Sequence, residues 1–429
     1  MVCPGGDTSC TSPASQPSER WRGPLAGALP PRVNDMSGLG IEAQRVLVLL
    51  DSGPGWSRGI LRSFMAVAQE RGWVPLHFHP YYPPPDLDWL ARTFAPAAAL
   101  VGPELLGTSL EPLLPASIVS VAADRSSEGI ASVCLDEGAI AAVALEHLLS
   151  KGLRHVTTFR FTSWRFAVER ERAFVERARA AGANVPAGWG SDELGSAKAV
   201  EDPVAIVEWL LGLPRPCGIF TCTDGWARIV IRSVRLAGLR IPEDVLLVGV
   251  DNDVVECELQ APWLSSVMVP WQEVGTSAER LVHRALSGQS SHVERQVILP
   301  VGVQARRSTD IWAVDDALVA KALRWIREHA HQRLSVPLVA RAVGGGRQRL
   351  ERRFRRALDR TVVEEIRRAR VEAAKKLLQT TKAGLNEVAQ RSGFSNTTLL
   401  NTAFRRELGM PPGVYRRRTH GMLASCRDE

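Results

Sequence analysis

Residues 385–409 read LNEVAQRSGFSNTTLLNTAFRRELG. Apolar side chains recur at steps of three and four residues on both sides of Gly393, which predicts two short helices joined by a tight turn. Ser395 is placed to cap the second helix, and Gly409, followed by Pro411-Pro412, is placed to end it. The pattern is typical of a helix-turn-helix unit, whose second helix lies in a DNA major groove.

A second unit of the same kind precedes this one. Residues 336–343 form a short apolar helical face, Gly344-Gly345-Gly346 supply a turn, and residues 347–358 place apolar side chains on one face and arginines on the other. A longer helix over residues 362–378 joins the two units. We therefore expect an all-α C-terminal domain that contains two helix-turn-helix units.

Charge separates this region from the rest of the chain. Residues 316–429 contain 25 Lys and Arg against 11 Asp and Glu, a net charge of +14. The other residues carry a net charge of −7, so the +7 of the whole chain conceals two opposite parts. A basic module beside an acidic one favours a nucleic-acid reader joined to a domain of another kind.

Strands and helices alternate through the preceding residues. Such alternation predicts parallel sheets with helices on both faces. A region of about 260 residues is too long for one ordinary sheet, so we expect two lobes. The expected strands are 46–50, 74–79, 97–101, 118–121, 132–135, 155–161, 218–221 and 245–250, and the expected helices are 60–71, 140–150, 170–181 and 227–237.

The chain of 429 residues has room for two or three domains. Met36 stands just before the first strand, so residues 1–35 either belong to a disordered extension or precede the true start. The expected divisions are a disordered extension over 1–42, an α/β domain over 43–305, a linker over 306–316, a helical domain over 317–418 and a tail over 419–429.

The sequence gives no sign of a membrane or secreted protein. No apolar run is long enough to span a bilayer, and the N-terminus lacks the pattern of a secretion signal. The seven cysteines are scattered and include no CxxC pair, so neither a structural zinc site nor a disulfide framework is expected. These features predict a cytoplasmic protein.

Over residues 317–418 the helical domain resembles the AraC/XylS family of transcription regulators. The stretches that carry the resemblance are Leu350-Glu351-Arg352-Arg353-Phe354, residues 370–378, Gly393-Phe394-Ser395, Phe404-Arg405-Arg406, Gly409, Pro412 and Tyr415-Arg416. The resemblance implies double-stranded operator DNA and RNA polymerase as partners. The residues expected to contact DNA are Arg347, Gln348, Arg349 and Arg352 in the first unit and Asn396, Thr397, Thr398, Asn401, Thr402 and Arg405 in the second.

The α/β region resembles the sugar-sensing domain of LacI-type regulators, a two-lobed fold shared with periplasmic binding proteins. The stretches that carry this resemblance are Asp136-Glu137, His147-Leu148, Gly152, Trp164, residues 169–174, Thr223-Asp224 and residues 241–243, 249–253, 264–267 and 306–310. With the domain order of residues 45–418, the resemblance implies a regulator that responds to a sugar, a pentose such as xylose.

A sugar offers hydroxyl groups and two apolar ring faces, which charged and flat aromatic side chains bind. In a fold of this kind the carboxyl ends of the strands bring such side chains together. The expected ligand-binding residues are, by the resemblance, Arg170, Asp224 and Asp251 at strand ends for hydroxyl groups, then Trp56 and Trp164 for the ring, and Asp51 and Arg58 in the first strand-to-helix loop.

Together these features predict a one-component activator, a homodimer without a cofactor, in which sugar binding changes how the reader modules engage DNA. The alternatives are an α/β enzyme or a regulator of another small ligand. Residues 53–59 have GxGxxxG spacing instead of the dinucleotide pattern, and no acidic residue follows the second strand for a ribose. His77 and His79 lack a third ligand at fixed spacing, so no metal site is expected. No catalytic motif is found, so no enzyme is expected.

Overall fold

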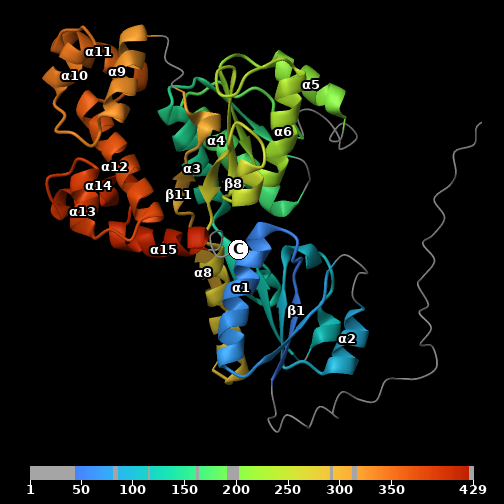
Figure 1. Cartoon of the computed structure of the whole chain (residues 1–429). Coiled ribbons are helices and arrows are strands. Elements are labelled where there is room, and N and C mark those ends of the chain that lie inside the picture. Colours follow the sequence, from blue (N-terminus) through green and yellow to red (C-terminus); the bar gives the residue numbers. More distant parts are fainter. Residues whose placement is uncertain are drawn as a thin grey trace, which may run out of the picture.

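The computed structural model describes residues 44–80, 86–114, 116–160, 164–190, 202–289, 293–311 and 316–424, with side chains described up to residue 419. The extension predicted over residues 1–42 and the end of the predicted tail lie outside the described residues. Figure 1 shows three bodies, namely two α/β lobes and a helical domain beside the upper lobe. No helix among the described residues is long and apolar enough to cross a membrane.

Lobe 1 contains a six-stranded sheet of order β10-β5-β4-β3-β1-β2, and all of its neighbouring strands are parallel. Strand β1, next to the edge strand β2, is fully buried over its apolar residues 46–49, as a strand covered on both faces should be. The elements are β1 (Arg45–Leu49), β2 (Val74–His77), β3 (Ala98–Val101), β4 (Ser117–Val121), β5 (Ala131–Leu135) and β10 (Arg295–Ile298), with α1 (Gly55–Glu70), α2 (Leu87–Phe94) and α8 (Trp271–Leu286), and the short 3-10 turns η2 (Pro103–Leu105), η3 (Glu111–Leu113) and η4 (Ser126–Glu128).

Lobe 2 contains a five-stranded sheet of order β11-β9-β8-β7-β6, in which only β11 runs antiparallel to its neighbour. The prediction of two lobes is confirmed. The elements are β6 (His155–Phe159), β7 (Cys217–Thr221), β8 (Val245–Asp251), β9 (Ser265–Met268) and β11 (Gly302–Gln304), with α3 (Glu137–Ser150), α4 (Arg165–Ala180), α5 (Pro203–Gly212), α6 (Asp224–Leu236) and α7 (Val254–Glu258).

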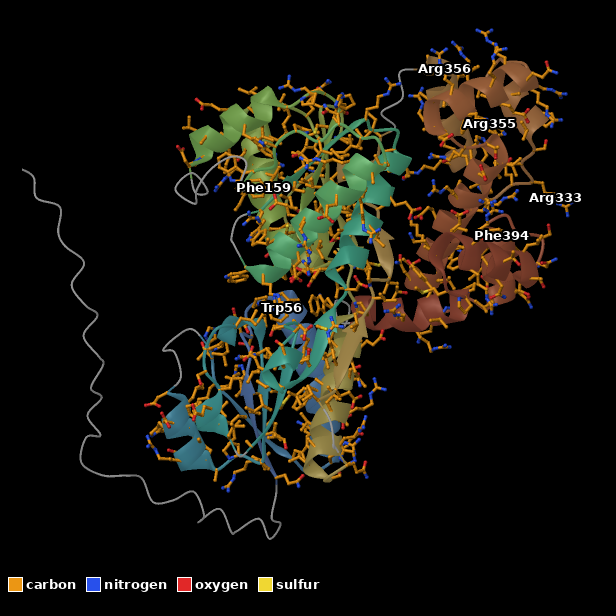
Figure 2. All side chains as sticks on the ribbon, turned by 180° about the vertical axis from the view of Figure 1, so that it is seen from behind. Trp56, Phe159, Arg333, Arg355, Arg356 and Phe394 are labelled. Atoms are coloured by element: carbon orange, nitrogen blue, oxygen red, sulfur yellow. The ribbon has the colours of Figure 1, made fainter. Side chains whose placement is uncertain are left out.

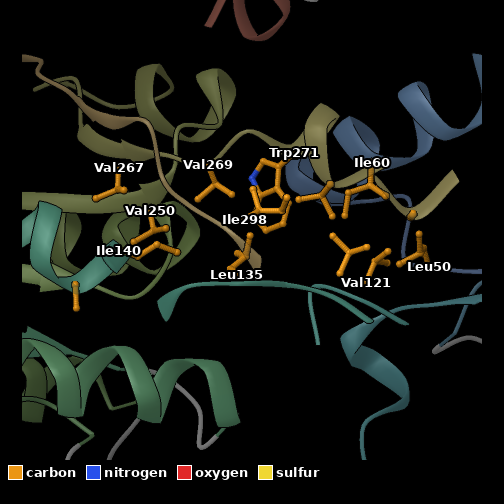
Figure 3. Packing of buried hydrophobic residues seen from close by; sticks show 14 of the residues in the cluster. Leu50, Ile60, Val121, Leu135, Ile140, Val250, Val267, Val269, Trp271 and Ile298 are labelled. Carbon is orange, nitrogen blue, oxygen red and sulfur yellow. The ribbon is translucent and has the colours of Figure 1, made fainter. Parts of the chain in front are cut away.

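The chain passes between the lobes three times, after β5, after β9 and after β10. Figure 3 shows Trp271 among Leu135, Val269 and Ile298, which come from these three passages. All four side chains belong to one apolar cluster that continues into both lobes. The passages therefore form one packed hinge, and the side of the molecule where the carboxyl ends of both sheets face each other is called the lobe junction below.

The helical domain confirms both predicted helix-turn-helix units. The first unit pairs α10 with α11, and the second pairs α13 with α14. At the turn of the second unit Gly393 has φ of 87°, and a Cβ atom there would lie 2.2 Å from the backbone oxygen of Ala330, so only glycine fits. The helices are α9 (Ala317–Glu328), α10 (Val336–Ala342), α11 (Arg347–Leu358), α12 (Val362–Thr380), α13 (Leu385–Arg391), α14 (Thr397–Leu408) and α15 (Pro412–Ala424).

One predicted cap is wrong by a single residue. Asn396, and not Ser395, caps α14, because its Oδ1 accepts a hydrogen bond from the backbone N–H of Leu399 at 2.9 Å. The joining helix α12 begins with a capping box, in which Thr361 and Glu364 each bond the backbone of the other. A well-capped helix of 19 residues fixes the spacing between the two units.

Within the predicted linker 306–316, residues 306–311 pack against lobe 2. Ser308 is fully buried, and its hydroxyl donates to the backbone oxygen of Leu247 at 2.6 Å. Thr309 is also buried, and its hydroxyl is 2.8 Å from Nε2 of His147 on α3. These contacts hold residues 306–311 on lobe 2.

Candidate functional site

The residues predicted to contact DNA in the first unit lie on the exposed face of α11. Gln348 and Arg349 point into solvent from its first turn, and Arg352 is exposed in the next. Arg347 forms an ion pair with Glu351 at 3.2 Å. The first turn of such a helix is the part that reaches base edges, so Gln348 and Arg349 remain the strongest candidates for base contacts.

Some polar side chains of α14 form hydrogen bonds with the backbone of the same helix. Asn396 uses its Oδ1 as the cap, and Nδ2 of Asn401 donates to the backbone oxygen of Thr397 at 3.0 Å. The side-chain amide of Asn396 keeps its donors, so it can still contact an acceptor on DNA. The remaining predicted residues, Thr398, Thr402 and Arg405, are exposed.

On the lobe 2 side of the junction, Arg170 is held by three contacts. It lies in the second turn of α4, so its predicted place at a strand end is wrong. Its guanidinium donates to Glu137 Oε2 at 2.5 Å and to the backbone oxygen of Cys222, just after β7, at 2.6 Å. The ring of Phe166 lies 4.9 Å from the guanidinium carbon. The positive charge of Arg170 is therefore fixed between α3, α4 and the end of β7.

Asp251 is the last residue of β8 and has φ of 108°, which is strained for a residue with a side chain. Asn252 follows with φ of 55°, so the chain turns sharply at the strand end. Burial raises the pKa of Asp251 well above its usual value, and the positive charge of Arg170 acts in the opposite direction. Asp251 thus combines a strained backbone at a strand end with a buried carboxyl group that interacts with a fixed guanidinium. This combination is typical of a binding site.

Asp224 has a different environment from the other predicted carboxylates. It is the first residue of α6 and 1% exposed. Its Oδ2 accepts from the backbone N–H of Asp253 at 2.9 Å and lies 3.4 Å from the Cys257 thiol. Burial raises its pKa to about 7. Through the Asp253 N–H, Asp224 holds the turn that follows Asp251, while its contact with a sugar stays a prediction.

Trp56 and Arg58 approach the junction from lobe 1. Both lie in the first turn of α1, so the predicted location of Arg58 in a loop is wrong. The Trp56 ring is 5.5 Å from the ring of the hinge residue Trp271, and Figure 2 shows Trp56 where the two lobes meet. Arg58 is exposed and donates to the backbone oxygen of Gly53. Trp56 thus offers an apolar ring at the hinge end of the junction.

Asp51 follows β1 as predicted and belongs to a polar cluster at the carboxyl ends of three strands. Its Oδ1 accepts from the Gly53 N–H at 2.8 Å and lies 3.1 Å from Nε2 of His79, which follows β2. Its backbone N–H donates to Glu104, which follows β3, at 3.4 Å. Burial raises the pKa of Glu104 to about 7. Glu104 was not among the predicted residues.

Trp164 stands just before α4 and has 52% of its surface exposed. Its ring lies 5.7 Å from Phe166, which in turn stacks on Trp226 at 6.2 Å. Because Phe166 also lies against Arg170, these rings extend from the buried guanidinium to the surface. Trp164 therefore keeps its predicted role as a candidate stacking residue, at the outer end of this aromatic series.

The two lobes touch directly at the first turn of α1. A Cβ atom built on Gly55 of lobe 1 would lie only 2.0 Å from Oδ2 of Asp253 in lobe 2. The same carboxylate caps α7 by accepting from the Val255 N–H at 3.0 Å. A carboxylate at the start of a helix is favoured by the helix dipole, so Asp253 also suits the N-terminus of α1. The structure thus has its lobes closed at this point.

Two protein-family models match this chain, one in the α/β region and one in the helical domain. A family model described as a periplasmic binding protein-like domain matches residues 145–309, and one described as a helix-turn-helix domain matches residues 339–418. Regulatory protein SoxS of Salmonella typhimurium is 32% identical over 101 residues, which is 24% of this chain and 94% of SoxS. The chain belongs to the AraC/XylS family of transcription regulators.

Other relatives of this AraC/XylS-family regulator match longer stretches of the chain. The xylose operon regulatory protein of Haemophilus influenzae is 29% identical over 287 residues, which is 66% of this chain and 74% of that protein. Its counterpart in Escherichia coli K12 is 32% identical over 211 residues, 49% of this chain and about half, 54%, of that protein. A solved structure of the xylose-binding transcription activator xylR is 24% identical, with a TM-score of 0.53 over 88% of this chain and 98% of that one, and it shows the shared fold.

Several residues that lie at the lobe junction were not predicted from the sequence. Glu137 lies two residues after the end of β5 and Asp253 two residues after the end of β8, so both had the signal of an acidic residue near a strand end. Trp271 had no such signal, because the return of the chain to lobe 1 before α8 cannot be seen in a pattern of apolar residues. The packing of the hinge therefore had to come from the structure.

Proposed function

We propose that this regulator binds a pentose at the lobe junction and, in response, controls a pentose-utilisation operon through operator DNA. One observation carries the ligand assignment, namely the Arg170 guanidinium that Glu137 and Cys222 hold. The guanidinium interacts electrostatically with the carboxyl group of Asp251, which stands at a strand end on a strained backbone. A fixed donor next to an acceptor matches neighbouring hydroxyl groups of a sugar. Xylose is the first candidate, because it appears in the names of relatives that match 66% and 49% of this chain.

The proposed regulation requires only that the sugar binds the closed arrangement of the lobes more tightly than the open one. A sugar that contacts groups from both lobes stabilises the closed arrangement, in which Gly55 and Asp253 touch, over an open one. The helical domain then binds DNA differently in the two arrangements. We assign the sensor to residues 43–305, with residues 306–311 packed on it, and DNA binding to residues 317–418.

The partners follow from this role. We infer an activator that works as a homodimer in the cytoplasm, contacts RNA polymerase, needs no cofactor and catalyses no reaction. The two helix-turn-helix units on α12 fit two successive major grooves about one turn of DNA apart.

The test is a binding screen with the full chain. Isothermal titration with xylose, arabinose, ribose and glucose is paired with electrophoretic mobility shifts on DNA upstream of the protein's own gene and neighbouring sugar genes. We expect one pentose to bind, to be recovered unchanged and to alter the affinity for one of these DNA fragments. Binding of no sugar, or chemical conversion of the sugar, would overturn the proposal.

A further inference from the structure

The helical domain is joined to lobe 2 along the whole length of α12. Before α12, Nη2 of Arg360 donates to the backbone oxygen of Ser150 at 2.9 Å. In its middle, Arg368 pairs with Glu146 of α3 at 2.9 Å. Near its end, the ammonium group of Lys375 donates to the backbone oxygen of Val303 in β11 at 3.2 Å. Contacts at three successive places fix the direction of this helix on lobe 2.

The second unit also shares its apolar core with the sensor. Met268 of β9 and Val301 of the hinge belong to the same buried cluster as Val371 and Leu378 of α12 and Phe404 of α14. Lys375 is only 6% exposed, so separating the two domains would uncover a buried charge as well as apolar surface. The second unit and lobe 2 thus share one apolar core.

The last helix reaches the other lobe. From α15, the Arg418 guanidinium pairs with Glu273 Oε2 at 3.0 Å and donates to the backbone oxygen of Leu299 at 2.7 Å. Glu273 lies in the first turn of α8, and Leu299 directly follows β10, so both partners belong to the hinge end of lobe 1. Figure 1 shows α15 running from the helical domain to α8. The second unit is therefore held by lobe 2 through α12 and by lobe 1 through α15.

We infer that Arg418 transmits the relative position of the two lobes to the second helix-turn-helix unit. This inference rests on the proposed function and concerns the regulation of the same sugar site. Since α15 packs on α14 through Tyr415 and Phe404, whose rings are 5.7 Å apart, a shift of lobe 1 against lobe 2 displaces the helix that carries the second recognition surface. The contacts of Arg418 with Glu273 and Leu299, called the bridge below, form in the closed arrangement and favour one orientation of α14.

Coupling between two ligands is reciprocal. If Arg418 links the sites, then sugar strengthens operator binding by the same factor by which operator DNA strengthens sugar binding. Arg418 is 18% exposed on its side chain, and its two contacts are charge-assisted hydrogen bonds. Their loss should lower both factors by about five- to thirty-fold, in line with about 1–2 kcal/mol for such contacts.

The experiment measures both factors in four full-length proteins. Operator affinity is measured with and without xylose, and xylose affinity with and without operator, for the wild type, Arg418→Ala, Glu273→Gln and the control Arg417→Ala. Arg417 is exposed on the same helix and carries the same charge, so its change reproduces any loss of phosphate contact. We expect both coupling factors to fall together in Arg418→Ala and Glu273→Gln and to persist in Arg417→Ala.

Amide hydrogen exchange along α15 gives a reading that needs no sugar. Glu273→Gln leaves the helical domain unchanged, yet exchange in the last turns of α15 should become faster, because their anchor on lobe 1 is weakened. Full coupling in both bridge variants, or unchanged exchange in Glu273→Gln, would reject the bridge. A wild type that responds to no sugar would reject the proposed function instead.

Discussion

Gly55→Ala should strengthen the unliganded fold and weaken the response to sugar. Gly55 is the first residue of α1 and has an ordinary helical backbone, so alanine fits there and should stabilise the protein by about 0.4–1 kcal/mol. In the closed arrangement, however, the new methyl group would lie 2.0 Å from Oδ2 and 2.6 Å from Cγ of Asp253. Ordinary contacts between such atoms are longer than 3.4 Å, so either the lobes separate or Asp253 moves.

Both outcomes, a movement of Asp253 or a separation of the lobes, weaken interactions that the structure shows. If Asp253 moves, it gives up its hydrogen bond to Val255, and the loss of a helix cap costs about 0.5–2 kcal/mol. If the lobes separate, the sugar loses contacts from one side. We therefore expect pentose affinity to fall by about three- to thirty-fold, as measured by titration calorimetry.

The matched control is Gly225→Ala, which places the same methyl group in the first turn of α6. Its nearest neighbour would be 4.0 Å away, so only the gain in stability is expected there. Combining Gly55→Ala with Asp253→Ala removes the clash and should make Gly55→Ala harmless to sugar binding in that background. If Gly55→Ala alone binds the pentose as tightly as the wild type, the closed contact between the lobes plays no part in the response.

Four further outcomes follow from the site. Asp251→Asn, which tolerates the positive φ, should lose roughly a hundredfold in sugar affinity, about 2–3 kcal/mol, and keep DNA binding in the absence of sugar; unchanged calorimetry would place the sugar elsewhere. Operator affinity should fall by roughly a thousandfold between low and moderate salt, and a flat dependence would contradict the two-unit reader. Gln348→Ala should cost about 1–3 kcal/mol on the preferred operator and relax one base position, whereas equal loss on all sequences would mark a phosphate contact. Because burial raises the pKa of Asp224 from 3.8 to about 7, ionising it opposes folding, so stability should decline from about pH 4 to pH 7, and Asp224→Asn should flatten that part of the urea-denaturation profile.

The helical domain could be predicted well because its signals are local. The apolar steps around Gly393 and the glycine stop at Gly409 fix helix boundaries without knowledge of the tertiary structure. The cap was misplaced by one residue, since Ser395 and Asn396 are both good caps and the backbone angle that selects between them is not visible in the sequence. At the first turn the cap position is Gly346, which supplies no side-chain bond.

The sensor was less predictable where its chain returns between lobes. The strands β1 to β8 could be recognised by their apolar runs, but β9, β10 and β11 were missed. No pattern tells that β10 joins the sheet of lobe 1 and β11 that of lobe 2. Arg170 illustrates the same limit within the site. Its side chain reaches the end of β7 from the second turn of α4, so its expected place at a strand end was wrong although the guanidinium lies beside one.

The two helix-turn-helix units differ in how they depend on the sensor. The first unit has a buried cluster built from α9 to α12 alone, including Leu350, Phe354 and Ile366. The cluster of the second unit includes Met268 and Val301 from the sensor, so only the first unit has a core that the helical domain makes alone. Binding by the first unit should therefore depend little on the sugar, while the second unit follows the lobes. A regulator built in this way can remain on its operator through one unit while the sugar adjusts the fit of the other.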